Sequence, residues 1–140
     1  SETNADGPDI IYGFKQGVSG DCVDLGDLLP SDFAFLPLIS VANVPAVNIA
    51  ASIVRVVCSN LDSSDDVVRE LETGSLIDFE LSEPSKSILV CADTQETGAE
   101  QRLFAASTMT GDLTVTQLAL FQSNYLDIDL WSSENFTSVV

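Results

Sequence analysis

Histidine is absent from this 140-residue sequence and basic residues are scarce: five lysines and arginines stand against 22 aspartates and glutamates, a formal net charge of −17. Without histidine, no Ser-His-Asp or Cys-His catalytic arrangement can form, and no general base is available near neutral pH at its ordinary pKa. The excess of carboxylates repels nucleic-acid phosphates and anionic membrane surfaces. The composition therefore predicts a protein that is not an enzyme and does not bind nucleic acid.

Long apolar runs are also missing. The longest weakly polar stretch, 33–47, contains Pro37 and Pro45, so no segment approaches the roughly 20 apolar residues that a membrane-spanning helix needs. The chain begins at Ser1 rather than at methionine, as a mature protein does after removal of a signal peptide. We therefore expect a secreted or cell-surface protein without a membrane span.

Cysteine occurs three times and never in a CxxC pair, which disfavours a zinc site. Cys58 and Cys91 each end a run rich in β-branched residues, and two such strands facing each other across a core can bring their Cα atoms to bridging distance. We predict a Cys58–Cys91 disulfide, as in exported proteins, with Cys22 as a free or intermolecular thiol. A pairing of Cys22 with either partner, or three reduced thiols, is the alternative.

Apolar residues make up 45% of the chain, enough for the core of one domain of this length. Apolar and polar residues alternate at 77–81 and 126–130, as in half-buried strands, and 88–91 is apolar throughout, as in a buried central strand. Such segments recur about every 8–12 residues. The sequence predicts an all-β fold with little or no helix: a single antiparallel β-sandwich, Ig-like or jelly-roll-like, of about seven to nine strands.

Three local patterns refine this outline. Segments 103–109 and 113–121 flank Gly111-Asp112, a typical hairpin turn. The apolar positions change parity near 52–53, which suggests a β-bulge. Segment 67–71 fits either a short strand or one helical turn capped by a preceding aspartate.

The ends of the chain suggest assembly. Residues 1–9 form an extended polar arm beside a single domain at 10–140, and 136–140 is β-prone. A terminal strand can extend the sheet of a neighbouring subunit, and contacts that do not close into a ring build a filament. We therefore expect a homo-oligomeric structural subunit of an extracellular, pilus-like filament that polymerises through terminal-strand exchange and apolar contacts.

The apolar, proline-rich segment 33–47 is either a contact surface in this assembly or an internal lid over the core. The interface candidates are Ile10, Ile11, Phe33, Phe35, Leu36, Leu38, Trp131 and Phe136.

Two loops offer hard oxygen ligands of the kind that Ca²⁺ prefers. Neither matches the EF-hand spacing, and aspartate also favours turns and helix caps for its own sake. No cofactor is therefore expected, with weak Ca²⁺ binding as the alternative. The candidate ligands are Asp21, Asp24, Asp27, Asp62, Asp65 and Asp66.

Tyr125, Asp127, Asp129 and Trp131 share one parity. On a strand they would form a face able to stack a sugar ring and bond its hydroxyls, although Trp131 can equally cover the core or enter a subunit contact. A monomeric Ig-like adhesion or carbohydrate-binding module, with a sugar or protein ligand, is thus the alternative function; a viral coat or decoration protein is a second. Asn135 begins an N-x-S/T glycosylation sequon.

Overall fold

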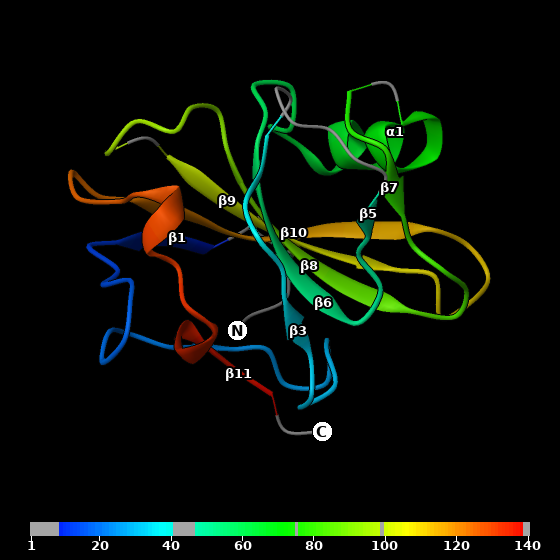
Figure 1. Ribbon diagram of the computed structural model, residues 1–140, viewed down its shortest axis with the longest axis horizontal. Helices are drawn as coiled ribbons and strands as arrows, with labels where there is room; N and C mark the ends of the chain where they lie inside the picture. Colours follow the sequence, from blue (N-terminus) through cyan, green and yellow to red (C-terminus); the bar gives the residue numbers. More distant parts are fainter. Residues whose placement is uncertain (1–8, 41–46, 75, 99, 139–140) are drawn as a thin grey trace.

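A seven-stranded mixed sheet forms the centre of the computed structural model, which describes residues 9–40, 47–74, 76–98 and 100–138 (Figure 1). Its strands lie in the order β1-β10-β9-β8-β6-β3, and β4 also pairs with β6. Two small sheets join β2 to β11 and β5 to β7. The prediction of a predominantly β fold is confirmed.

The described strands are β1 (Asp9–Tyr12), β2 (Val23–Asp24), β3 (Ala34–Phe35), β4 (Ile39–Ser40), β5 (Val47–Asn48), β6 (Ser52–Val57), β7 (Phe79–Glu80), β8 (Lys86–Ala92), β9 (Gln101–Ser107), β10 (Thr114–Gln122) and β11 (Phe136–Thr137). The helices are α1 (Ser64–Thr73) and the 3₁₀ helices η2 (Ile128–Leu130) and η3 (Ser133–Asn135).

Strand direction differs from the expected antiparallel pattern. In the main sheet, β9 runs antiparallel to both β8 and β10, as the predicted hairpin requires. The pairs β1–β10, β6–β8, β3–β6 and β4–β6 are parallel. Parallel neighbours need a long crossover, and between β6 and β8 the crossover contains α1. The expectation of little or no helix missed this element, and segment 67–71 lies within it.

Both faces of the sheet are covered. Along β8, Ile88 and Val90 belong to one buried cluster while Leu89 and Cys91 belong to the other, so the predicted central strand is confirmed. On the second face the cover comes from α1, β5, β7 and neighbouring loops, which Figure 1 shows gathered at one side of the sheet. The first face is covered by loops and by the short elements η2 and β11.

Helix α1 has well-defined ends. The Ser63 side chain accepts a hydrogen bond from the Asp66 amide at 3.2 Å, so the cap is Ser63 and not the expected Asp65 or Asp66. Both aspartates instead occupy the first turn, where negative charge interacts favourably with the helix dipole. Gly74 ends the helix at φ 59°, and its amide donates to the Glu70 carbonyl at 2.8 Å.

Two other sequence predictions are wrong. Segment 126–130 is not a strand but contains η2, because the Asp127 carboxylate accepts the Asp129 amide at 2.9 Å and turns the chain. The parity change near 52–53 is not a bulge, since β6 pairs with β8 in unbroken register from Ser52 to Val57. The cause is a turn between β5 and β6, in which Ala51 adopts a φ of 53°.

The segment after α1 depends on one buried carboxylate. Glu70 is 4% exposed, and its Oε1 accepts the backbone amides of Leu76, at 2.8 Å, and of fully buried Ile77. Glu70→Ala leaves both donors without this acceptor, and we expect a loss of about 2–3 kcal/mol in the free energy of unfolding.

Urea denaturation would measure this loss. Glu70→Gln keeps an acceptor oxygen and should lose about 1 kcal/mol, whereas exposed Glu72→Ala on the same helix should change stability by less than about 0.5 kcal/mol. Equal stability of Glu70→Ala and Glu72→Ala would contradict the assigned role.

Candidate functional site

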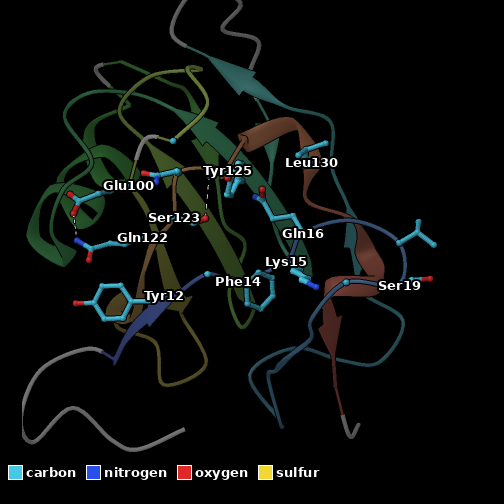
Figure 2. A pocket seen from close by; sticks show the side chains of 15 residues that line it. Tyr12, Phe14, Lys15, Gln16, Ser19, Glu100, Gln122, Ser123, Tyr125 and Leu130 are labelled. Carbon is cyan, nitrogen blue, oxygen red and sulfur yellow. Dashed lines mark hydrogen bonds between the residues drawn. The ribbon is translucent and has the colours of Figure 1, made fainter.

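An open groove of about 1100 Å³, here called the tyrosine groove, lies at the ends of β1 and β10. Its lining comes from the end of β1 and the following loop (12–16, 18–20), the loop before β9 (98, 100), the end of β10 and its continuation (122–125), and residue 130 in η2. Figure 2 shows Tyr12, Glu100 and Gln122 on one side of the groove and Ser19 and Leu130 on the other.

Exposed apolar side chains gather in this groove. Both tyrosines of the chain line it, Tyr12 at 72% and Tyr125 at 81% exposure, together with exposed Val18 and Leu130. Only two other large hydrophobic residues among those described, Ile10 and Met109, are exposed. Because a concave apolar surface with polar groups at its rim is the usual form of a ligand site, the tyrosine groove is the candidate functional site.

The groove loop is fixed by backbone hydrogen bonds. Gly13 donates to the Gln122 carbonyl at 3.0 Å, which ties the loop to β10. The Asp21 amide donates to the Lys15 carbonyl at 2.7 Å, and the Asp21 carboxylate accepts the Lys15 amide at 2.9 Å. A Cβ on Gly20 would lie 2.3 Å from the Lys15 carbonyl oxygen, so this tight loop requires glycine there.

An aromatic cluster supports the floor. Phe14 lines the groove, and its ring lies 5.1 Å from the rings of both Phe121 and Trp131. Trp131 also stacks on Phe136 at 5.3 Å. These contacts hold Phe14 from below with side chains that belong to the buried core of the first sheet face.

Two buried side-chain amides, of Gln101 and Asn135, hold the loop that lines the groove. Gln101, fully buried, accepts hydrogen bonds through its Oε1 from the Trp131 indole and from Gln16 Nε2. Asn135, also fully buried, accepts from the Gly17 amide at 2.9 Å and donates to the Asp21 carbonyl at 2.8 Å. A glycan on the Asn135 amide of the predicted sequon would displace the bonds that this nitrogen donates.

The sequence grouped four residues as a possible sugar-binding face, and only one of them, Tyr125, lines the tyrosine groove. For Trp131 the sequence left open sugar stacking, a subunit contact or a place over the core; the side chain is 2% exposed and belongs to the core. Asp127 caps the 3₁₀ helix η2 and Asp129 lies within it, so the two do not form a strand face with Trp131. Tyr125 does lie on the surface. Tyr12, which is also exposed, was not identified as a site residue.

The other interface candidates mostly pack on their own domain. Ile11, Phe33, Phe35 and Leu38 contact the first core cluster and Leu36 the second, Phe136 is 4% exposed, and only Ile10, at 53%, is largely exposed. The start of the polar arm (1–8) and part of the proline-rich segment (41–46) lie outside the described residues.

Several of the candidate calcium ligands already form hydrogen bonds or ion pairs within the chain. Asp21 and Asp24 accept backbone amides within their own loop, and Asp62 contacts Arg102 at 3.4 Å. Asp66 pairs with Arg69 at 3.1 Å, while Asp27 offers its carbonyl to Lys86. Over residues 9–40, 47–74, 76–98 and 100–138, no three His, Cys, Asp or Glu side chains are grouped to hold a metal ion. Calcium binding stays a prediction.

The predicted Cys58–Cys91 disulfide is not present, and Cys22, Cys58 and Cys91 are free thiols. Cys91 lies in β8 and Cys58 directly follows the neighbouring strand β6, so the two do not face each other across a core. Cys91 pairs with Val56, two residues before Cys58, so the geometry of adjacent strands separates their Cα atoms by about 8 Å, beyond bridging distance. Burial raises the pKa of both thiols.

A separate carboxylate cluster lies beside β8 and β9. Arg102 contacts Asp62 at 3.4 Å and Glu100 at 3.6 Å, and the Asp93 side chain hydrogen-bonds with Asp62. Burial, this hydrogen bond and the charge of Asp62 raise the pKa of Asp93 to about 6, against the opposing effect of Arg102. The Asp93 carboxyl therefore takes up a proton in a mildly acidic range, above the usual range of an aspartate.

The raised pKa of Asp93 predicts a pH dependence of stability. Because Asp93 has a higher pKa in the folded chain than in the unfolded chain, its contribution is fully present below about pH 4 and is lost as pH rises through about 6. We expect Asp93→Asn to raise the unfolding midpoint at pH 7 relative to the parent chain, with the difference vanishing below about pH 4. Thermal unfolding at a series of pH values measures it.

Asp112→Asn, in the exposed turn between β9 and β10, serves as the control and should leave the pH profile unchanged. If Asp93→Asn shifts the midpoint equally at pH 4 and pH 7, the raised pKa of Asp93 is not the cause.

No helix in the described parts of the chain has the length and apolar character needed to cross a bilayer. Comparison of the chain with protein-family models, with curated proteins and with solved structures gives no match. The geometry of the tyrosine groove is therefore the basis on which a function can be argued.

Proposed function

We propose that the protein is a non-catalytic carbohydrate-binding module that acts in adhesion outside the cell, with the tyrosine groove as its binding site. The observation that carries this proposal is the exposure of both tyrosines, 72% and 81%, in one concave groove. An exposed aromatic ring offers a flat apolar face, and a pyranose ring presents a matching face of C–H groups with hydroxyls around its edge.

Polar groups at the rim suit the hydroxyls of such a ligand. Ser19 and Asn124 line the groove, are exposed, and have no side-chain hydrogen bond to any described residue. Gln122 and Ser123 lie beside them, although Gln122 donates to Glu100 and the Ser123 hydroxyl accepts the Tyr125 amide at 3.2 Å. Amide and hydroxyl groups can donate and accept at once, as sugar hydroxyls do.

The rigid support of the groove favours binding over catalysis. Phe14 rests on a packed aromatic cluster and Gln16 is bonded to buried Gln101, so the site is largely formed before a ligand arrives, which lowers the entropic cost of binding. The lining contains one acid, Glu100, and that carboxylate already accepts a hydrogen bond from Gln122. A glycoside hydrolase uses a pair of carboxyl groups across the scissile bond.

Filament formation, the first expectation from the sequence, has less support. In the described residues β1 pairs with β10 and β11 pairs with β2, so both terminal strands have partners in their own chain. Strand exchange would have to break one of these pairings. Assembly of this kind, and a role as a viral coat or decoration protein, stay predictions.

The stacking role of the tyrosines predicts a loss of glycan binding on truncation. We expect Tyr12→Ala and Tyr125→Ala each to weaken binding of the best-bound oligosaccharide by about two- to tenfold, since one aromatic contact contributes about 0.5–1.5 kcal/mol. A glycan array identifies the oligosaccharide, and calorimetric titration measures the dissociation constant.

Met109→Ala is the matched control because Met109 is an exposed apolar residue, at 50%, outside the groove. All three variants should keep the parental unfolding temperature, as exposed truncations do. A parent chain that binds no glycan, or a double tyrosine variant with parental affinity, would refute the proposed function.

A further inference from the structure

The basic residues differ in whether they have partners. Arg69 and Arg102 form ion pairs with carboxylates, Arg55 donates to backbone carbonyls and lies 4.9 Å above the Phe35 ring, and Lys86 donates to the Asp27 carbonyl at 2.7 Å. The Lys15 ammonium has no hydrogen bond or ion pair with any described residue. It is the one basic side chain without a polar partner in the described parts of a chain that carries a net charge of −17.

Lys15 lies in the tyrosine groove. Figure 2 shows its side chain between Phe14 and Ser19 in the groove lining. Its backbone is held on both sides, by the Asp21 carboxylate at its amide and by the Asp21 amide at its carbonyl. The loop therefore fixes where the side chain starts and leaves the ammonium available to a ligand.

The acid in the groove lining does not pair with this ammonium. Glu100 also lines the groove, but its carboxylate is used by Gln122 and by Arg102, the latter at 3.6 Å. The Lys15 ammonium without a polar partner, and a Glu100 carboxylate that is already held by other groups, favour a negatively charged ligand group beside Lys15. At physiological ionic strength, salt screens charges that lie more than about 8 Å from a ligand. The charge of a bound group is therefore recognised mainly by Lys15 in the groove, and less by the overall negative charge of the chain.

We propose that the ligand is an acidic glycan whose ring carboxylate, as in hexuronic or sialic acids, pairs with Lys15 while Tyr12 and Tyr125 stack on the sugar faces. This inference rests on the proposed carbohydrate-binding function and names its substrate class. A carboxylate on a pyranose ring lies at the edge of the stacking face, and so a charge beside two aromatic rings fits such a sugar better than a neutral one.

The experiment compares acidic sugars with their own methyl esters. Oligogalacturonate, oligoglucuronate and a sialylated oligosaccharide are titrated calorimetrically against the full chain, each beside its methyl ester, which removes the charge and keeps the ring. The same titrations are run with Lys15→Gln and with Arg69→Gln. Arg69→Gln removes one positive charge from α1, outside the groove, and so controls for net charge.

The parent chain should bind at least one acid about two- to fivefold more tightly than its ester, as one solvent-accessible ion pair allows. Lys15→Gln should abolish this preference and leave ester binding unchanged, whereas Arg69→Gln should keep it. The preference should also shrink as salt rises from about 0.05 to 0.5 M.

Equal binding of acid and ester by the parent chain, or a preference that survives in Lys15→Gln, overturns the assignment. If esters or neutral glycans bind and that binding depends on the tyrosines, only the carboxylate inference fails. If no glycan binds in any form, the proposed function fails with it.

Discussion

The fold depends on a central sheet that is apolar on both faces. In β8, neighbouring residues such as Ile88 and Leu89 are both fully buried but in opposite directions. A strand of this kind is stable only if each face has its own cover, since exposed apolar area costs roughly 25 cal/mol per Å². The helix α1 with β5 and β7 supplies one cover. The other is built from loops, and the tyrosine groove forms where these loops meet the end of the sheet.

The pattern of apolar residues in the sequence predicted the structure well where the chain forms regular strands. The hairpin of β9 and β10 and the central position of β8 follow from apolar periodicity and from Gly111 in the turn. Strand direction does not follow, because periodicity is the same in parallel and antiparallel strands. The ten residues of α1 were missed because Val67 and Val68 favour strands, while the capping serine and the terminal glycine that define the helix are short signals.

The site was harder to predict than the fold. Tyr125 was identified, but it was grouped with Trp131 on the assumption of a strand, and the Asp127 side chain instead turns the chain there. That one local hydrogen bond sends Trp131 into the core and leaves Tyr125 outside. The groove also brings together segments around residues 12–20, 98–100 and 122–130, and single-sequence patterns carry no information about such distant contacts. The sequence showed that basic residues are scarce, but it could not show that one of them, Lys15, lies in the groove without a polar partner among the described residues.

The hydrogen bonds of Asn135 have a consequence for the order of events during synthesis. Asn135 fixes the loop at Gly17, 118 positions earlier in the chain, and Trp131 supports Phe14 across a similar separation. Because translation runs from the N-terminus, residues 12–20 leave the ribosome well before residues 131–135. The wall and the floor of the groove therefore cannot take their final positions until the later segment has been made and has packed against them.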